Sequence, residues 1–117
     1  MLETQLKQTI TEYLQLQQKL GNLFFERLNA GSFPTQSGRW AVGCHKGAPD
    51  FVVWKKAHFE GVNCSFWYCR SILIELKGYR GKQSDYQKEY QEIAENQFAE
   101  YYVIKSVEEL QEILEVS

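Results

Sequence analysis

The sequence predicts a single α/β domain in which a central mixed β-sheet is flanked by helices, with the element order α-β-β-β-α-β-α. Three observations lead to this prediction. The chain has 117 residues, which is the length of one domain. Its 44% hydrophobic and 24% charged residues are ordinary for globular proteins, which excludes disordered and collagen-like classes. Segments with helical periodicity alternate with short apolar runs of strand length.

The first part of the chain predicts a helix, a strand and a long loop. Residues 2–20 repeat apolar side chains at intervals of three and four, which is typical of one helix face: Leu2, Leu6, Ile10, Tyr13 and Leu14. Gly21 and Asn22 indicate the end of this helix. Residues 23–28 form an apolar run of strand length, and residues 29–47, rich in Gly, Ser and Thr, are expected to form a loop.

The middle of the chain predicts two strands, over residues 50–56 and 66–77, that pair antiparallel. Residues 57–65 are expected to connect them, and residues 78–82 interrupt the pattern after the second strand.

The last part predicts a helix, a strand and a helix. The helix at residues 84–98 gathers one set of side chains on a single face: Tyr86, Tyr90, Ile93, Ala94 and Gln97. Residues 101–104 form a short strand. The helix at residues 106–116 is expected to turn four apolar side chains inward: Val107, Leu110, Ile113 and Leu114.

Composition also bounds the cellular setting. No apolar run approaches the roughly 18 residues that a membrane span needs, and the N-terminus lacks a signal-peptide pattern. Three cysteines cannot all pair, so reduced thiols are the simplest expectation. We therefore expect a cytoplasmic protein that does not bind a membrane.

Charge is distributed unevenly along the chain. Residues 39–82 carry a net charge of +5, whereas residues 83–117 carry −7. A basic centre indicates a polyanionic partner such as nucleic acid. The alternative for the acidic part is a helix with a solvated charged face.

Three charged residues interrupt the apolar strands. Asp50 opens the first strand of the antiparallel pair, and Glu75 and Lys77 end the second. Residues two apart on a strand share a face, so Glu75 and Lys77 point to the same side. Strand pairing would bring Asp50 beside Glu75. The ordinary alternative is that Glu75-x-Lys77 is a surface ion pair worth under about 1 kcal/mol.

Two adjacent carboxylates repel each other unless a cation lies between them. Oxygen ligands favour Mg²⁺ or Mn²⁺, and the Leu76 backbone carbonyl would add a further oxygen. Lys77 would orient or deprotonate a water, or stabilise charge on a phosphate. This combination is typical of metal-assisted phosphodiester hydrolysis.

Three short motifs follow one another along the chain: Gly47-Ala48-Pro49-Asp50-Phe51, Ile74-Glu75-Leu76-Lys77 and Gly81-Lys82-Gln83-Ser84-Asp85-Tyr86-Gln87. Together they resemble the VRR-NUC domain, the virus-type replication-repair branch of the PD-(D/E)xK nuclease superfamily. The first helix with Glu3, and Arg27-Leu28-Asn29-Ala30-Gly31, are also similar to the family's opening. Residues 57–69 depart from the family, because this stretch is longer and more aromatic than its compact hairpin.

The resemblance implies a restriction-endonuclease-like PD-(D/E)xK core and a homodimeric endonuclease that acts on branched DNA, as Holliday-junction resolvases do. It makes Asp50 and Glu75 metal ligands and Lys77 the catalytic lysine. It also places Glu3 near the metal and assigns Gln87 as the family's helix glutamine. Gln87 has an alternative role, because Ser84-x-x-Gln87 is a capping box. Glu3 has one as well, since acids are common in a first helical turn.

Further residues flank these motifs. Candidate DNA contacts are Arg39, Lys46, Arg80, Lys82 and the possible base-stacking Tyr79. The loop at residues 78–82 has no Walker spacing, so we expect no nucleotide and no other small organic cofactor. Zinc is a weak alternative, because the spacing of Cys44, Cys64 and Cys69 is irregular.

Two other functions stay open on sequence grounds. One is a nuclease-like module that grips branched DNA or a protein partner without cutting. The other is a nuclease subunit of a larger transposition or restriction system. The intact set of Asp50, Glu75 and Lys77 argues against the first.

Overall fold

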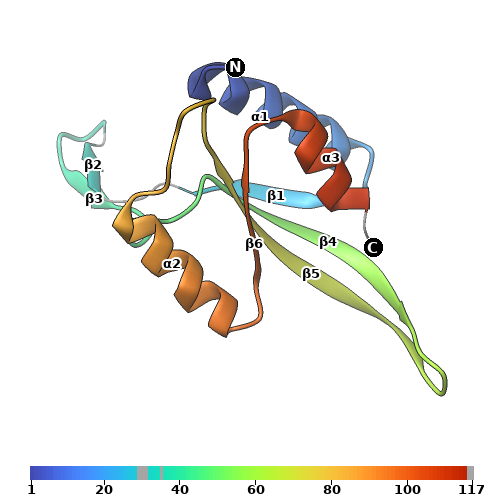
Figure 1. Ribbon diagram of the computed structural model, residues 1–117. Coiled ribbons are helices and arrows are strands. Elements are labelled where there is room, and N and C mark those ends of the chain that lie inside the picture. Colours follow the sequence, from blue (N-terminus) through green and yellow to red (C-terminus); the bar gives the residue numbers. More distant parts are fainter. Residues whose placement is uncertain (29–31, 35, 116–117) are drawn as a thin grey trace.

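A four-stranded mixed sheet organises the chain in the computed structural model, which describes residues 1–28, 32–34 and 36–115 (Figure 1). Its strands lie in the order β1-β4-β5-β6, with the bounds β1 Phe24–Arg27, β4 Phe51–Glu60, β5 Ser65–Leu76 and β6 Glu100–Ile104. β4 pairs antiparallel with both β1 and β5, whereas β6 runs parallel to β5. The predicted α/β class with a mixed sheet is confirmed.

Three helices cover the two faces of the sheet (Figure 1). α1 (Glu3–Lys19) and α3 (Val107–Glu115) lie on one face, and α2 (Asp85–Asn96) lies on the other. The larger core is therefore the layer between the sheet and α1 with α3, where the buried side chains include Leu6, Ile10, Leu14, Phe51, Ile72, Ile74 and Leu110. A smaller core under α2 contains Val52, Leu73 and Tyr101.

The first helix follows its predicted apolar stripe closely. Leu6, Ile10 and Leu14 are fully buried, but Leu2 is exposed because it precedes the first helical residue. The helix ends where Gly21 adopts a φ of +82°. Gly21 N–H then donates to Gln18 O (3.0 Å) and Asn22 N–H to Gln17 O (2.9 Å), a Schellman motif that satisfies the last carbonyls.

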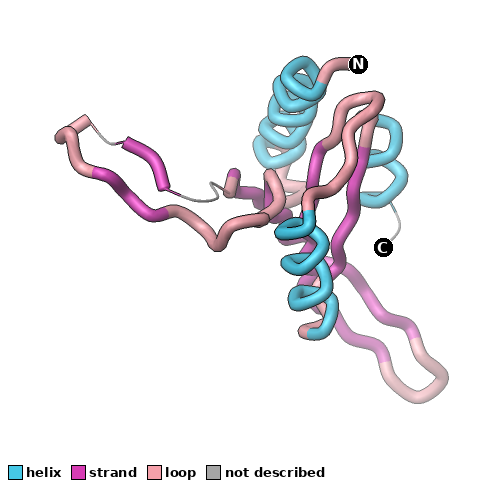
Figure 2. The backbone as a smooth tube through the Cα atoms, turned by 60° about the vertical axis from the view of Figure 1, so that its left-hand side comes forward, coloured by secondary structure: helices cyan, strands magenta, loops and turns pink. Residues whose placement is uncertain are grey.

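The β4–β5 ribbon is longer than the sequence pattern predicts. Residues 57–60 and residue 65 were expected in a connection, yet they continue the strands to a short turn at residues 61–64. Aromatic cross-strand neighbours extend the ladder, with the Phe59 and Phe66 rings stacked at 5.1 Å between centroids. Figure 2 shows that this end of the ribbon projects away from the helices.

The expected loop at residues 29–47 contains a second, two-stranded sheet. β2 (Ser32–Pro34) pairs antiparallel with β3 (Trp40–Val42), so the simple element order lacks these two strands. Residues 29–31 and 35 lie outside the described residues, as do residues 116–117. The Asn29-Ala30-Gly31 part of the family-like opening therefore has no structural counterpart here. In the part of the chain that the structure describes, no helix is both long and apolar enough to cross a membrane.

Candidate active site

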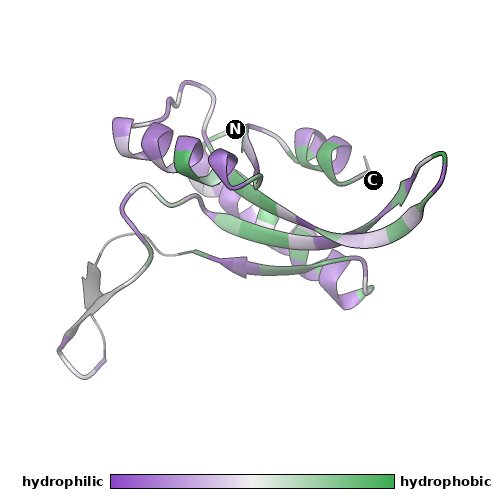
Figure 3. Ribbon diagram, turned by 90° about the horizontal axis from the view of Figure 1, so that it is seen from below, coloured by the Kyte–Doolittle hydropathy of each residue, from purple (hydrophilic) through white to green (hydrophobic). Residues whose placement is uncertain are grey.

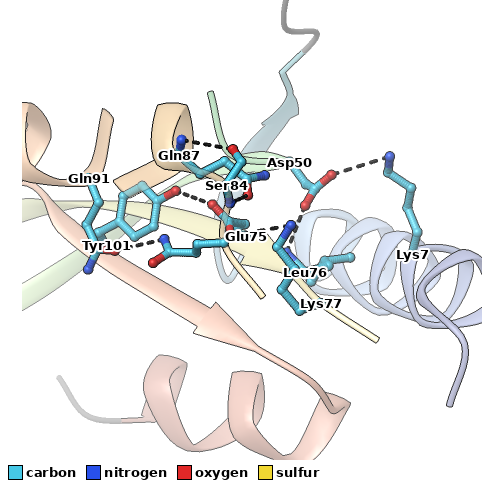
Figure 4. Close-up of polar contacts among 10 residues, drawn as sticks. Lys7, Asp50, Glu75, Leu76, Lys77, Ser84, Gln87, Gln91 and Tyr101 are labelled. Atoms are coloured by element: carbon cyan, nitrogen blue, oxygen red, sulfur yellow. Dashed lines mark hydrogen bonds and ion pairs between the residues drawn. The ribbon is translucent and has the colours of Figure 1, made fainter. Parts of the chain in front are cut away.

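The antiparallel register brings the two predicted carboxylates together (Figure 4). Asp50 lies one residue before β4, and Glu75 is the penultimate residue of β5. Phe51 pairs with Ile74, and the Asp50 N–H donates to Ile74 O at 3.0 Å. Continuing this register by one pair sets Asp50 opposite Glu75, as the sequence predicts.

Glu75 is a buried carboxylate whose two oxygens differ. Its side chain is 1% exposed. The Tyr101 hydroxyl donates to Oε1 at 2.5 Å, but Oε2 has no hydrogen-bond partner among the described residues. Lys77 Nζ lies 3.9 Å from Oε2, within ion-pair range but beyond hydrogen-bond distance. Glu75 and Lys77 therefore share a side, as predicted, and Lys77 does not satisfy the buried oxygen.

Asp50 makes one contact with β5 and another with α1. Its Oδ2 accepts a hydrogen bond from the Leu76 N–H at 2.7 Å. Its Oδ1 lies 3.3 Å from the Nζ of Lys7, a residue of α1. The Leu76 amide thus fixes the Asp50 carboxylate next to the Glu75 position, while Lys7 neutralises its charge.

The residue of α1 that contacts this site is Lys7 rather than Glu3. Glu3 instead lies beside Gly78, where an added Cβ would come within 3.1 Å of the Glu3 nitrogen. Within the described residues, no cluster of three His, Cys, Asp or Glu side chains is placed to hold a metal, so Glu3 does not join Asp50 and Glu75. The predicted metal role of Glu3 has no support from this arrangement.

Tyr101 is a site residue that the sequence reasoning missed, because it was assigned only to a strand. Burial, followed by its hydrogen bond to Glu75, raises the pKa of Tyr101 well above its ordinary value, so the hydroxyl stays a proton donor. Gln83 lowers this pKa in part, and its Nε2 donates to Gln91 Oε1 at 2.9 Å.

Gln87 forms the capping box that was its alternative role. The Ser84 N–H donates to Gln87 Oε1 at 2.8 Å, and the Gln87 N–H donates to Ser84 Oγ at 3.2 Å. The side-chain oxygen of Gln87 is therefore used to start α2. A catalytic role for Gln87 stays a prediction.

The predicted DNA contacts lie in separate places. Tyr79 and Arg80 are exposed and border a cavity of about 640 Å³ beside the start of α1. Lys46 Nζ lies 4.1 Å from the centre of the Tyr86 ring, at the edge of another cavity of about 460 Å³ against α2. Arg39 and Lys82 are also exposed. The structure thus shows all five side chains at the surface, and their role in DNA binding stays a prediction.

Gly47, in the loop before Asp50, allows a close approach to α2. Its φ is +90°, and an added Cβ would lie 2.3 Å from Tyr86 O. Only glycine fits there without a shift of backbone. The close packing against α2 thus explains why the Gly47-Ala48-Pro49-Asp50 motif begins with glycine.

The donor set around Glu75 fits a hard divalent cation. Asp50 and Glu75 offer carboxylate oxygens, and the buried Glu75 Oε2 lacks the partner that such an atom normally has. The Leu76 carbonyl stays a predicted third ligand. Of the three cysteines, Cys64 and Cys69 are exposed and Cys44 is partly buried.

Comparisons of the chain with protein-family models, with curated proteins and with solved structures found no match. The likeness to VRR-NUC domains therefore depends on the chain's own motifs, Asp50, Glu75-x-Lys77 and the segment that starts α2.

Proposed function

We propose that the protein is a Mg²⁺- or Mn²⁺-dependent, structure-specific DNA endonuclease that hydrolyses phosphodiester bonds in branched DNA, with Holliday junctions as the expected substrate. The observation that carries this proposal is the buried, unpartnered Oε2 of Glu75 beside Asp50 and Lys77. A restriction-endonuclease-like core, a homodimer and a cytoplasmic location are parts of the same proposal.

The cost of burying a charged oxygen supports a bound cation. A buried carboxylate oxygen that accepts no hydrogen bond is unfavourable by about 1–3 kcal/mol, whereas a divalent ion would satisfy Oε2 and relieve its repulsion with Asp50. Asp50, Glu75 and the Leu76 carbonyl would hold this ion. The ion would polarise the phosphodiester and favour deprotonation of water at neutral pH.

The chain's own residues have distinct tasks in this scheme. Tyr101 holds Glu75 through Oε1 and leaves Oε2 available. Lys77, mostly buried next to Glu75, would orient the attacking water and stabilise negative charge on the phosphate. The water oxygen forms a bond to phosphorus as the bond to the 3′ oxygen breaks, which yields a 5′-phosphate and a 3′-hydroxyl.

One contact favours a second candidate, a module that binds branched DNA without cutting. Lys7 lies 3.3 Å from Asp50 Oδ1 and can neutralise that carboxylate in place of a metal ion. In this alternative the charged cluster would be a structural ion-pair network. A nuclease subunit of a larger system would share the catalytic site and differ only in its partners.

Cleavage of a labelled synthetic four-way junction in Mg²⁺, Mn²⁺ and EDTA tests the proposal. Linear duplex and flap substrates serve as controls for structure. We expect metal-dependent cutting of the junction that Asp50→Asn and Lys77→Ala each reduce by about 100-fold or more. Asn keeps an acceptor for the Leu76 N–H, so this variant should fold. Lys88→Ala, a charge change on the exposed side of α2, should cut normally.

Binding of the same junction, measured by fluorescence anisotropy, separates the two candidates. A nuclease should bind with similar affinity before and after Lys77→Ala while cutting is lost. Tight binding without cutting in either metal would favour the binding module. Equal cutting by the parent and by Lys77→Ala would refute the site assignment.

A further inference from the structure

The far end of the β4–β5 ribbon, residues 57–68, is an arm that carries aromatic side chains into solvent. Figures 1 and 2 show it beyond the helices, and Figure 3 shows hydrophobic residues near its tip. Trp67 is 67% exposed, and three more aromatic residues are almost half exposed: Phe59, Phe66 and Tyr68. Phe59, Phe66 and Tyr68 contact one another on one face of the arm, and Trp67 lies on the opposite face. Exposed aromatic residues of this number usually mark an interaction site.

One face of the arm combines an aromatic ring with a lysine. Trp67 pairs across the strands with His58, and their ring centres are 4.7 Å apart. Lys56 Nζ lies 5.5 Å from the centre of the Trp67 ring. Glu60 offsets part of this charge through its contact with His58 at 3.0 Å. Lys56 therefore places one exposed positive charge beside the Trp67 ring.

This face is the sheet face that carries Glu75. Side chains alternate along a strand, so Trp67, Cys69, Ser71, Leu73 and Glu75 point to the same side of β5. Leu73 confirms the side, because it belongs to the core under α2 together with Tyr101, the partner of Glu75. The eight-residue interval between Trp67 and Glu75 spans about 26 Å along the strand.

We propose that the arm is a second DNA-binding site, which holds the substrate about eight base pairs from the bond that is cut. Trp67 packs against a backbone sugar there, and Lys56 contacts the adjacent phosphate. This inference rests on the proposed function. It adds a second DNA contact to the one at the catalytic site. The length of one duplex of the branched DNA should therefore determine how tightly the DNA binds.

Shape and charge favour DNA over a second copy of the chain as the occupant. A two-stranded β-ribbon is narrow enough to enter the major groove. Aromatic rings next to lysine are the usual means of gripping nucleic acid without reading its sequence. On the same face, α2 carries four acidic residues and one lysine, so this helix does not attract a polyanion, and Lys56 supplies the basic contact on the arm.

A series of junctions in which one arm is shortened stepwise provides the test. The other arms and the predicted cut site stay constant, and affinity is measured in Ca²⁺ so that no cutting occurs. We expect the parent protein to gain about five-fold or more in affinity once the variable arm exceeds about eight base pairs. Trp67→Ala should remove this length-dependent step in affinity, and Trp67→Phe should retain most of it.

Two further variants complete the design. Phe98→Ala alters an aromatic residue that is 96% exposed but lies after α2, outside the arm, and should keep the length-dependent gain in affinity. Lys56→Ala should lower the salt dependence of binding by about one unit of slope. A step of equal size in Trp67→Ala would overturn the arm's role while leaving the nuclease proposal intact.

Sedimentation of the DNA-free protein tests whether the arm binds a second copy of the chain instead of DNA. If Trp67→Ala lowers the oligomeric state and leaves the length-dependent affinity unchanged, the arm contacts a second copy and our inference is wrong. If the step is present but Asp50→Asn does not affect cutting, the arm binds DNA and the catalytic assignment fails. If the parent binds no junction, both proposals are refuted.

Discussion

The two ends of the β4–β5 ribbon both depart from the usual distribution of polar and apolar residues. One end buries a charged side chain, and the other exposes aromatic side chains. At one end a carboxylate, Glu75, is buried in the sheet with one oxygen unpartnered. At the other end Trp67 and Phe66 stand in solvent. Both ends belong to the same pair of strands and follow one uninterrupted register.

This contrast shows that strand formation and function make separate demands on the same segment. Aromatic and β-branched residues favour the extended backbone along the whole ribbon. Burial is then decided by what covers each end, since helices cover the Glu75 end and leave the arm bare (Figure 1). Each end keeps an interaction that the chain itself does not satisfy, and each is therefore where we place a ligand.

The largest expected difference between the two ends concerns stability. Phe51 is 0% exposed, whereas Phe66 is 49% exposed, although both lie on the α1 side of the ribbon. Phe51→Ala should lower the free energy of unfolding by about 3–5 kcal/mol through lost burial and a cavity. Phe66→Ala should lower it by less than about 1 kcal/mol. Urea denaturation followed by circular dichroism measures both.

If Phe51→Ala does not fold, Phe51→Leu supplies the comparison with a smaller loss. A cost for Phe66→Ala as large as that for the Phe51 variant would mean that the arm is packed against something in solution. The contrast between a covered and a bare end would then fail.

Local sequence signals predicted the covered end well. The apolar stripe of α1 and the antiparallel pairing of the two apolar strands fixed which side chains are buried and set Asp50 opposite Glu75. The Ser84-x-x-Gln87 pattern identified the start of α2 because a capping box involves only neighbouring residues.

The contacts that the sequence did not reveal depend on packing between distant segments. Tyr101 reaches Glu75 because β6 happens to pair parallel with β5, and Lys7 reaches Asp50 because α1 crosses the end of β4. Neither pairing follows from local periodicity. The arm was missed for another reason: Gly61 and Asn63 suggested a long connection, although only residues 61–64 turn.

An ion pair marks the point where the ribbon leaves the core, and its loss should have the next largest effect. Arg70, 6% exposed, donates two hydrogen bonds to Glu100 at 2.7 and 2.8 Å and one to Ile113 O at 3.2 Å. Glu100→Gln removes the negative charge from the group that accepts two of these hydrogen bonds. We expect a loss of about 2–3 kcal/mol at pH 7, below the figure for a fully buried pair because Glu100 is partly exposed.

The pH dependence of this loss has a definite sign. The hydrogen bond from Arg70 holds the pKa of Glu100 below its ordinary value. A lowered carboxylate pKa stabilises the folded state above about pH 4.3, and this contribution disappears as the pH falls through the folded-state pKa. The gap between the parent and Glu100→Gln should therefore narrow below about pH 4. A gap that is constant from neutral to acidic pH would show that the pair adds no charge-dependent stability.

The smallest predicted effect is stabilisation of the folded protein by Mg²⁺, which should depend on the buried end of the ribbon and not on the arm. A divalent cation that binds only the folded protein stabilises it, by about 1.4 kcal/mol at about ten times its dissociation constant. Mg²⁺ should therefore raise the unfolding midpoint of the parent above that in NaCl of equal ionic strength. Glu75→Gln should abolish the increase, because it removes the charge on the oxygen that lacks a partner. Trp67→Ala should keep it in full, since the arm lies about 26 Å away. An equal Mg²⁺ response in all three proteins would place the ion elsewhere and remove the main support for a metal at Glu75.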